Sequence, residues 1–317
     1  MIRLAFLGCG RIARAHARRL RRHEADIRIG FASRDARRAA AFARELGGTA
    51  HGTYEQAIAS PELDAIAIVT PPAFHLELAL AALAAGKHVV LEKPALPRAS
   101  DFARVAGAAS AAGKRVFVAE NYQYKPLLRR IRALLAAGEI GEPLFVHVNA
   151  IKRQSVEGNW RADPALALGG ALYEGGIHWI DFMASLGWPV RGVRGVMPKP
   201  AAGVERSMLV SFEYESGPVG TLSYSWEVPA LGNGLRLSKI YGRAGSITFE
   251  SNGLWVLLHG KKTRFYPGLV DVSGYQAMWA DFVAAWKAGS EPAMTLEYAR
   301  RDLALVEQAY ATAGAST

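Results

Sequence analysis

Short apolar runs and helical patterns alternate through the first part of the chain. Apolar runs at 2–7, 27–32, 65–69, 88–91 and 115–119 predict strands. Helical patterns lie between them, at 11–22, 36–46, 54–60, 74–85 and 101–112. Apolar runs without alternation are typical of strands buried on both faces, and strands that alternate with helices form parallel sheets. The pattern therefore predicts an α/β fold with a doubly wound parallel sheet.

The pattern changes after Tyr122. Helical patterns at 126–137, 177–186, 275–288 and 296–313 are now separated by β-like runs at 144–151, 193–197, 207–214, 219–227, 235–241, 246–249 and 254–259. Turn residues separate many of these runs, namely Pro198 with Pro200, 215–217, 232–234 and 251–253. Runs joined by such turns predict a second, α+β part built on a largely antiparallel sheet.

Two glycines stand between the first apolar run and the first helical pattern. Gly8-Cys9-Gly10, with Ala13, reads G-x-G-x-x-A. Gly8 permits a tight turn, Gly10 lets the backbone approach a pyrophosphate, and the small Ala13 lets the helix pack against the strand. The helix N-terminus attracts the phosphates. This predicts a dinucleotide site that also includes Arg11 and Ile12, and the alternative is an ordinary tight turn.

Composition narrows the class of protein. The 317 residues are half hydrophobic and carry a net charge of +10, which suits a globular protein of two domains. Arg3 and the Gly8 turn leave the first apolar run too short for a signal peptide, and we expect no membrane-spanning segment. The single cysteine, Cys9, excludes an intrachain disulfide and suits a reducing cytoplasm. The arginines are scattered over helical patterns without an aromatic platform, so we expect no nucleic-acid partner.

The second predicted strand is followed by Ser33-Arg34-Asp35, with Arg38 one turn later. A ribose with a free 2′-hydroxyl usually meets an acidic residue at this place, whereas a 2′-phosphate meets arginine and hydroxyl groups. Ser33 can hydrogen-bond such a phosphate and Arg34 can bind it bidentately. This favours NADP. The alternatives are that Asp35 binds the ribose of NAD, or that the arginines only face water.

Two further segments follow predicted strands. In open α/β sheets, ligands bind at the carboxyl ends of the strands. We therefore expect the residues after 65–69 and 88–91 to lie near the cofactor, namely Thr70, Pro71, His75, Glu92 and Lys93. Lys93 is placed to exchange a proton with a substrate hydroxyl. Taken alone, Lys93 would be an ordinary surface lysine.

The segment GGALYEGGIHWID contains Glu174, His178 and Asp181. We expect Gly175 and Gly176 to let the chain turn sharply into a helix, with Glu174 and His178 about one turn apart. This pair can orient a polyol and relay its proton. A third metal ligand at suitable spacing is absent, so no metal is expected. Alternatively, His178 is a buried, hydrogen-bonded histidine. We expect Asp181 to orient or cap.

In this order, the segments GCGRIA, TPPAFH, LEKP, NYQYKP and GGALYEGGIHWID resemble the Gfo/Idh/MocA oxidoreductase family, named for glucose–fructose oxidoreductase and inositol dehydrogenase. The resemblance implies that Lys93 transfers the proton and that His178 contacts the reacting hydroxyl or carbonyl. Family members commonly carry an aspartate where this chain has Glu174. The resemblance also implies that Tyr122, Trp160 and Arg161 line the substrate cleft; Trp160 otherwise belongs to the core.

These observations predict a cytoplasmic, NADP-preferring oxidoreductase that moves a hydride between the nicotinamide and a sugar, polyol or related cyclic hydroxy compound. Residues 1–121 would form a Rossmann domain and 122–317 a domain for substrate binding and oligomerisation, whose last helix packs back on the first. Lys93, His178 and Glu174 are the catalytic candidates. By analogy, we expect a homodimer or homotetramer. The alternatives are a redox-neutral elimination or hydrolysis with a tightly held cofactor, and a non-catalytic dinucleotide sensor.

Overall fold

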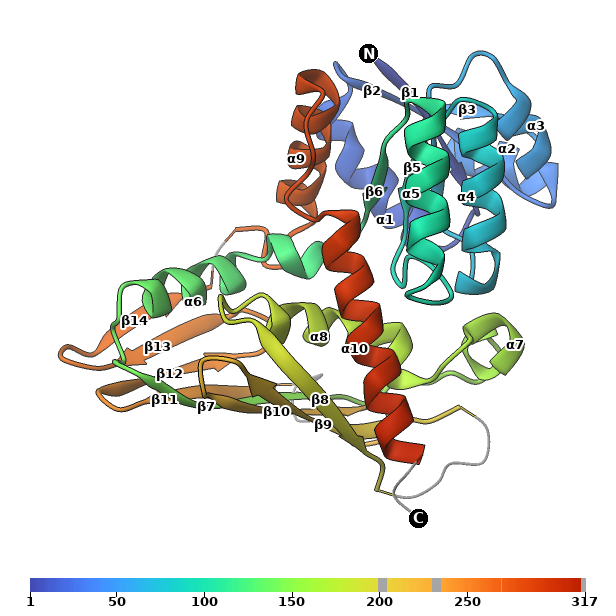
Figure 1. Cartoon of the computed structure of the whole chain (residues 1–317). Coiled ribbons are helices and arrows are strands. Elements are labelled where there is room, and N and C mark those ends of the chain that lie inside the picture. The colour runs from blue at the N-terminus through green and yellow to red at the C-terminus, as the bar shows by residue number, and fades with distance from the viewer. Residues whose placement is uncertain (199–203, 230–234, 269, 315–317) are drawn as a thin grey trace. The chain divides into compact units, whose positions relative to one another are not determined.

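The computed structural model describes residues 1–198, 204–229, 235–268 and 270–314. It divides the chain into two compact units (Figure 1). The first unit comprises Met1–Glu120 and Tyr275–Arg300, and the second comprises Asn121–Gly274 and Arg301–Thr317. The turns expected at Pro200 and at 232–234 lie outside the described residues.

The first unit is built on a six-stranded parallel sheet with the strand order β3-β2-β1-β4-β5-β6. Its strands are β1 (Ile2–Leu7), β2 (Ile27–Ala32), β3 (Thr49–Ala50), β4 (Ala65–Ile68), β5 (His88–Leu91) and β6 (Val116–Val118). The chain passes from β1 to β2 on one side and returns to β4 on the other, so the strand order reverses beside β1. This confirms the predicted doubly wound sheet. The pattern does not predict β3, because its two residues are exposed.

Helices cover this sheet. They are α1 (Arg11–Leu20), α2 (Ala36–Leu46), α3 (Tyr54–Ala59), α4 (His75–Ala84), α5 (Asp101–Ala112) and α9 (Tyr275–Ala288), with short 3-10 turns at Arg21–His23 and Pro72–Phe74. Helix α4 packs against α5, and α1 packs against α9 (Figure 1). The Asp35 side chain caps α2 by accepting the N–H of Arg37. Ser100 stands at the N-cap of α5 but makes no capping bond.

The second unit is built on an eight-stranded sheet with the order β14-β13-β12-β11-β7-β10-β9-β8. Its strands are β7 (Pro143–Ile151), β8 (Val190–Val196), β9 (Ser207–Tyr214), β10 (Val219–Ser225), β11 (Leu237–Gly242), β12 (Gly245–Glu250), β13 (Trp255–His259) and β14 (Arg264–Pro267). Strands β7 and β10 pair in parallel, and the other pairs are antiparallel. The largely antiparallel sheet is confirmed. The exposed edge strand β14 is not predicted by the apolar pattern.

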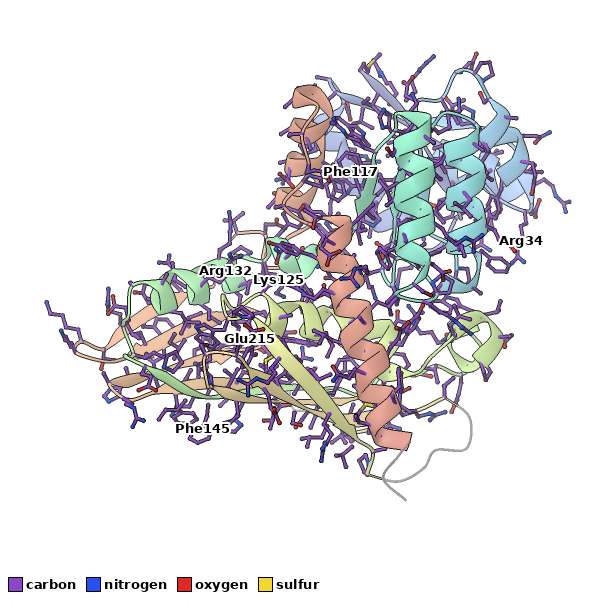
Figure 2. The ribbon with its side chains drawn as sticks, viewed as in Figure 1. Arg34, Phe117, Lys125, Arg132, Phe145 and Glu215 are labelled. Carbon is purple, nitrogen blue, oxygen red and sulfur yellow. The ribbon has the colours of Figure 1, made fainter. Side chains whose placement is uncertain are left out.

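One face of this sheet is covered and the other is open. The helical elements of this unit are α6 (Pro126–Ala136), α7 (Pro164–Ala167), α8 (Ile177–Ala184) and, from Arg301 onwards, α10 (Leu296–Gly314). There are also 3-10 turns at Asn121–Tyr124 and Trp160–Ala162 and a π-helical turn at Leu172–Gly176. Helix α8 packs on the sheet, its Phe182 ring lying 5.8 Å from the ring of Phe249. The buried Asp181 of α8 pairs with Arg301 and Ser185, which suits an orienting role. Phe145 projects from the open face, away from α6 (Figure 2).

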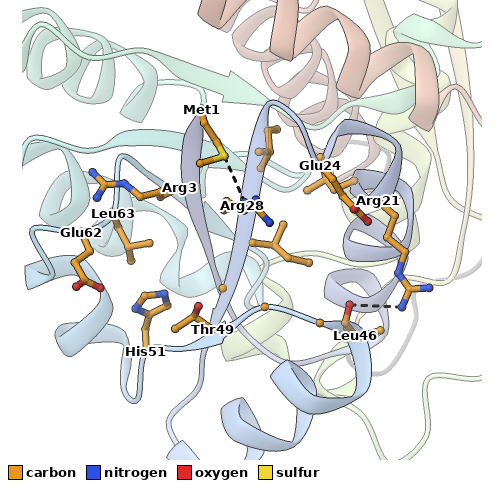
Figure 3. Close-up of a pocket in the computed structure, with 16 residues that line it drawn as sticks. Met1, Arg3, Arg21, Glu24, Arg28, Leu46, Thr49, His51, Glu62 and Leu63 are labelled. Atoms are coloured by element: carbon orange, nitrogen blue, oxygen red, sulfur yellow. Dashed lines mark hydrogen bonds between the residues drawn. The ribbon is translucent and has the colours of Figure 1, made fainter.

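A cavity of about 550 Å³ opens at the amino ends of β1 and β2 (Figure 3). Met1, Arg3, Arg28 and His51 are among the residues that line it. Arg3 is paired with Asp64, and the Arg28 side chain donates to the Met1 sulfur at 3.4 Å. The cavity lies at the end of these strands opposite the Gly8 turn, and is therefore distinct from the predicted dinucleotide site.

A buried carboxyl, Glu205, holds the chain just before the π-helical turn. Its Oε1 accepts the N–H of Leu172 at 2.6 Å, and its backbone oxygen accepts the N–H of Ala171 at 2.8 Å. The Tyr310 hydroxyl lies against the same carboxyl and accepts the N–H of Gly170. Burial raises the pKa of Glu205 to about 7. The folded chain therefore favours the protonated carboxyl.

We expect Glu205→Gln to remove a pH dependence of stability. In the wild type, the unfolded carboxyl ionises from about pH 4.5 upwards while the folded one keeps its proton until about pH 7, so stability falls between these values. The free energy of unfolding of the variant, relative to wild type, should therefore rise by roughly 2 kcal/mol between pH 5 and pH 8. Urea titrations at both pH values measure this difference. The exposed Glu215→Gln is the control (Figure 2), and parallel curves for Glu205→Gln and wild type would contradict the prediction.

Candidate active site

The predicted cofactor residues of the first unit gather at one edge of its sheet. Strands β2, β1, β4 and β5 are parallel neighbours, so their carboxyl ends meet at the same edge. The loops that follow them begin at residues 8, 33, 69 and 92. Backbone hydrogen bonds fix two of these loops, from Gly8 N–H to the Ala32 oxygen and from Glu92 N–H to the Ile68 oxygen, both at 3.0 Å. The edge therefore has the geometry of a crevice at a topological switch point.

The two motif glycines serve different purposes. Gly8 has a φ of +115°, which residues with a Cβ rarely adopt, and an added Cβ would lie 3.1 Å from the Val69 oxygen. Gly10 has an extended backbone that any residue can adopt, and an added Cβ would meet no atom within 4 Å. The fold therefore does not require glycine at position 10. The open space beside Gly10 lies at the N-terminus of α1. The first turn of α1 contains exposed Arg11 and half-buried Ile12 and no acidic side chain.

A dinucleotide pyrophosphate fits this open space, because the first N–H groups of a helix and its dipole bind anions. Ala13 is fully buried, as expected of the small residue that lets α1 approach β1. Cys9 is buried below the turn, where burial raises the pKa of its thiol. The Thr70 hydroxyl oxygen at the same edge is buried and has no hydrogen-bond partner in the described part of the chain. These features suit a polar ligand.

The loop after β2 presents the predicted ribose-phosphate residues. Ser33 is buried directly behind the strand end, and Arg34 is exposed (Figure 2). Arg38 donates through Nε to the Cys9 oxygen at 3.0 Å, and this bond holds its guanidinium against the turn between β1 and α1. The Asp35 carboxylate accepts the N–H of Arg37 at 3.0 Å. Asp35 is thus used as a helix cap.

His75 links the loops after β4 and β5. It is fully buried, and one ring nitrogen lies 3.0 Å from the Pro94 oxygen and 3.2 Å from the Ala95 oxygen. The other ring nitrogen lies 2.9 Å from the Thr70 oxygen. Burial lowers the pKa of His75, while the backbone oxygens that face its ring act in the opposite direction. His75 therefore shapes the crevice by holding backbone, and Pro71 follows in the same loop.

Lys93 is half-buried, and its backbone N–H donates to the Glu92 carboxylate at 3.0 Å. The other Glu92 oxygen lies 2.6 Å from His16. Trp279 of α9 donates to the second nitrogen of His16 at 3.0 Å. Sequence reasoning missed His16 and Trp279. The available signal was that His16 is the polar residue among the buried alanines and leucine of α1.

In the second unit, three predicted cleft residues meet. Arg161 donates to the Glu174 carboxylate at 2.6 Å. The Arg161 guanidinium also lies over the Trp160 ring, 4.4 Å from its centre. The Glu174 carboxylate is buried. Arg161 therefore compensates the charge of Glu174 and at the same time makes a cation–π contact with Trp160.

The remaining predicted residues form a second group. The Tyr122 ring stacks on His178 with ring centres 4.4 Å apart and an interplanar angle of 14°. Lys125 is buried, its ammonium 4.4 Å from the centre of the Tyr122 ring, and it donates to the Asn252 oxygen at 3.1 Å. Lys125 was not predicted, although it lies in the NYQYKP segment. A buried cation therefore stands next to the Tyr122–His178 stack.

The expected sharp turn at Gly175 and Gly176 is wrong. The chain runs as one π-helical turn, Leu172–Gly176, directly into α8 with right-handed dihedral angles at Gly176. The glycines instead allow close approach, because a Cβ on Gly175 would lie 2.1 Å from the Tyr224 hydroxyl. Burial raises the pKa of Tyr224 well above its ordinary value, and the charge of Glu174 acts in the same direction. π-Helical turns frequently mark functional sites.

None of the helices in the described part of the chain is long and apolar enough to span a membrane. Nowhere in the described ranges do three or more His, Cys, Asp or Glu side chains gather in a way that could hold a metal ion.

Comparison with known protein families identifies the class. Residues 2–120 match the oxidoreductase family with an NAD-binding Rossmann fold, Gfo/Idh/MocA. Residues 128–248 match the Gfo/Idh/MocA C-terminal domain. The chain therefore belongs to the Gfo/Idh/MocA oxidoreductase family. This confirms the predicted resemblance and the prediction of an enzyme of the oxidoreductase class.

Individual relatives agree with this assignment. The chain is 34% identical over 210 residues to the D-xylose 1-dehydrogenase (NADP(+)) of Haloferax volcanii, an alignment that covers 65% of this chain and 63% of that protein. It is 26% identical over 303 residues to the 4-carboxy-2-hydroxymuconate-6-semialdehyde dehydrogenase of a Sphingobium species, which covers 92% of both chains. A solved oxidoreductase from Thermotoga maritima superposes with a TM-score of 0.88 at 26% identity, covering 99% of this chain and 97% of that one.

We expect Gly10→Ala to separate binding from folding. The added methyl meets no protein atom, so the thermal midpoint of the free protein should stay unchanged. The methyl enters the space before α1, so the dissociation constant for NADPH should rise about tenfold or more, at least about 1.4 kcal/mol. Calorimetry of the free protein and titration with NADPH measure both.

Gly8→Ala is the matched control, because its positive φ and the contact with Val69 should lower the midpoint itself. Unchanged NADPH binding by Gly10→Ala would mean that the pyrophosphate does not lie there.

Proposed function

We propose that the chain is an NADP-preferring oxidoreductase acting on a CH–OH carbon of a sugar, polyol or related cyclic hydroxy compound. The observation that carries this proposal is the open space before Gly10 at the N-terminus of α1. The name of the xylose dehydrogenase relative supports both the sugar and the cofactor. The nicotinamide, when bound, supplies the hydride acceptor or donor.

In this proposal the loops at the sheet edge hold the cofactor. The pyrophosphate would lie against Gly8, Gly10, Arg11 and Ile12. The loops after β4 and β5, with Thr70, Pro71, Glu92 and Lys93, would border the nicotinamide. Buried His75 would act on the cofactor through the loop backbone that it holds.

The preference for NADP rests on the loop after β2. Asp35, which would have to bind the ribose of NAD, is engaged as the cap of α2. Arg34 is exposed beside the buried Ser33, and Arg38 is hydrogen-bonded to Cys9 in the turn between β1 and α1. Two guanidinium groups and a hydroxyl suit a 2′-phosphate.

We expect Arg34→Ala to abolish the preference for NADPH. Loss of a bidentate contact with a doubly charged phosphate should weaken NADPH binding about tenfold or more and leave NADH binding unchanged. Titrations monitored by tryptophan fluorescence measure both constants. Arg37→Ala is the control, because the Arg37 side chain is 94% exposed and lies beside Asp35. Equal weakening of NADPH binding in the two variants would contradict this role of Arg34. Tighter binding of NADH than of NADPH by the wild type would contradict it as well.

For the chemistry, we propose that Lys93 exchanges the proton of the substrate hydroxyl and that His178 binds the same oxygen. Stacking on Tyr122 fixes the ring plane of His178. Glu174, the third candidate, would act together with Arg161, to which it is paired. Tyr122 and Trp160 would provide faces for the substrate ring, because aromatic faces pack against apolar ring surfaces.

We expect Lys93→Met to lower kcat by about 10²–10⁴-fold while NADPH binding stays within about twofold, because only the proton-transfer group is lost. Lys93→Arg keeps the charge but does not release a proton at neutral pH, so it should bind NADPH normally and remain equally slow. Oxidation of a panel of aldoses and polyols with NADP provides the measurement. Undiminished turnover by either variant would remove Lys93 from the reaction.

The open face of the second sheet supports the expected homo-oligomer. Phe145, Val219 and Tyr241 are cross-strand neighbours on β7, β10 and β11, with 47%, 43% and 38% of their surfaces exposed. We propose that a second copy covers this apolar face, because contiguous exposed apolar area commonly marks an interface. We also place the protein in the cytoplasm, in keeping with its single, buried cysteine.

A further inference from the structure

A chain of buried hydrogen bonds runs beneath Lys93 in the first unit. The indole N–H of Trp279 donates to Nδ1 of His16 at 3.0 Å. Nε2 of His16 lies 2.6 Å from one oxygen of Glu92, and the other oxygen accepts the N–H of Lys93 at 3.0 Å. His16, Trp279 and Glu92 are each at most 5% exposed. The chain joins α9, α1 and the end of β5.

The indole fixes the state of the histidine. An indole N–H can only donate, so Nδ1 of His16 must be the unprotonated nitrogen. The proton then sits on Nε2 and is donated to Glu92. Ring contacts hold this orientation, because Phe6 stacks on His16 while Trp279 and Tyr275 meet it edge-on. One donor on α9 therefore sets the tautomer of a residue on α1.

Glu92 consequently spans two parts of the proposed site. One of its oxygens is bound to α1, the helix that starts at the open phosphate turn, and the other holds the backbone of Lys93. We propose that Trp279, His16 and Glu92 form a positioning triad, which sets the backbone of Lys93 at a fixed distance from the pyrophosphate-binding end of α1. This inference rests on the role proposed above for Lys93. None of the three needs to touch the substrate.

The chain offers a matched pair of variants on one helix. Trp286 also lies on α9, its ring packs on Phe117 with centres 4.6 Å apart, and its N–H is buried without a partner among the described residues. Trp279→Phe and Trp286→Phe remove the same atoms, but only the first removes a donor from His16. We expect kcat to fall about tenfold in Trp279→Phe alone, the effect of one lost buried hydrogen bond. KM and the dissociation constant for NADPH should stay within about twofold of wild type in both.

A second pair tests rescue at His16. His16→Gln can accept from the indole through its amide oxygen and donate to Glu92 through its amide nitrogen. His16→Leu keeps the bulk and does neither. We expect His16→Gln to keep most of kcat and His16→Leu to lose about as much as Trp279→Phe. If the three residues only stabilised the fold, kcat of the four variants would instead fall in the order of their loss of thermal stability.

Hydrogen exchange gives a readout that is independent of turnover. Exchange at the Lys93 amide, followed by mass spectrometry of peptides spanning 88–96, should accelerate in Trp279→Phe and His16→Leu and stay at the wild-type rate in Trp286→Phe and His16→Gln. Unchanged exchange in Trp279→Phe would overturn the triad. Accelerated exchange with equal kcat in Trp279→Phe and Trp286→Phe would overturn its role in positioning but leave the proposed function standing. If Lys93→Met were as active as wild type, the role proposed for Lys93 would fail, and with it the positioning role of the triad, whereas a wild type that oxidises none of the aldoses and polyols would contradict the proposed function itself.

Discussion

Parallel pairing of β2, β1, β4 and β5 is the constraint on which the first unit depends. Parallel strands end at a common edge, so four loops that are far apart in the sequence must emerge side by side. The reversal of strand order beside β1 keeps the crossover helices from covering that edge. The N-terminus of α1, the arginines after β2 and Lys93 after β5 are thereby brought to one place without a long loop to carry them.

In the second unit, the candidate site residues are held together by close contacts between polar groups. Glu174 and Arg161 are paired at 2.6 Å in a position where the carboxylate has lost its water. Such pairs contribute little net stability, since desolvation offsets much of their attraction. Breaking one of them leaves a buried charge uncompensated, which is strongly unfavourable. The pair therefore restricts the Arg161 guanidinium to a single place against Trp160, in keeping with the part proposed for Arg161 and Glu174 in the reaction.

The sequence predicted those features that depend only on residues close together along the chain. Apolar runs identified the buried strands, and the spacing of Gly8, Gly10 and Ala13 identified the tight turn between β1 and α1. Strands β3 and β14 were missed because exposed edge strands have no apolar signature. The helical path of Gly175 was missed because glycine permits both a turn and a close contact, and the partner, Tyr224, is distant in sequence. The contact between His16 and Trp279 joins residues on the first and ninth helices, so no local pattern contains it.

The return of α9 to the first unit has a consequence for the order in which the protein is made. Chains leave the ribosome N-terminus first, so the parallel sheet can pair once β6 has emerged. The apolar ring of Phe117, which packs on Phe282, and the Nδ1 atom of His16 then stay uncovered while residues 121–274 of the second unit are translated. The larger part of the second unit, Asn121–Gly274, is in effect an insertion between β6 and α9. The nascent nucleotide-binding unit is completed only by one of the last helices to be synthesised.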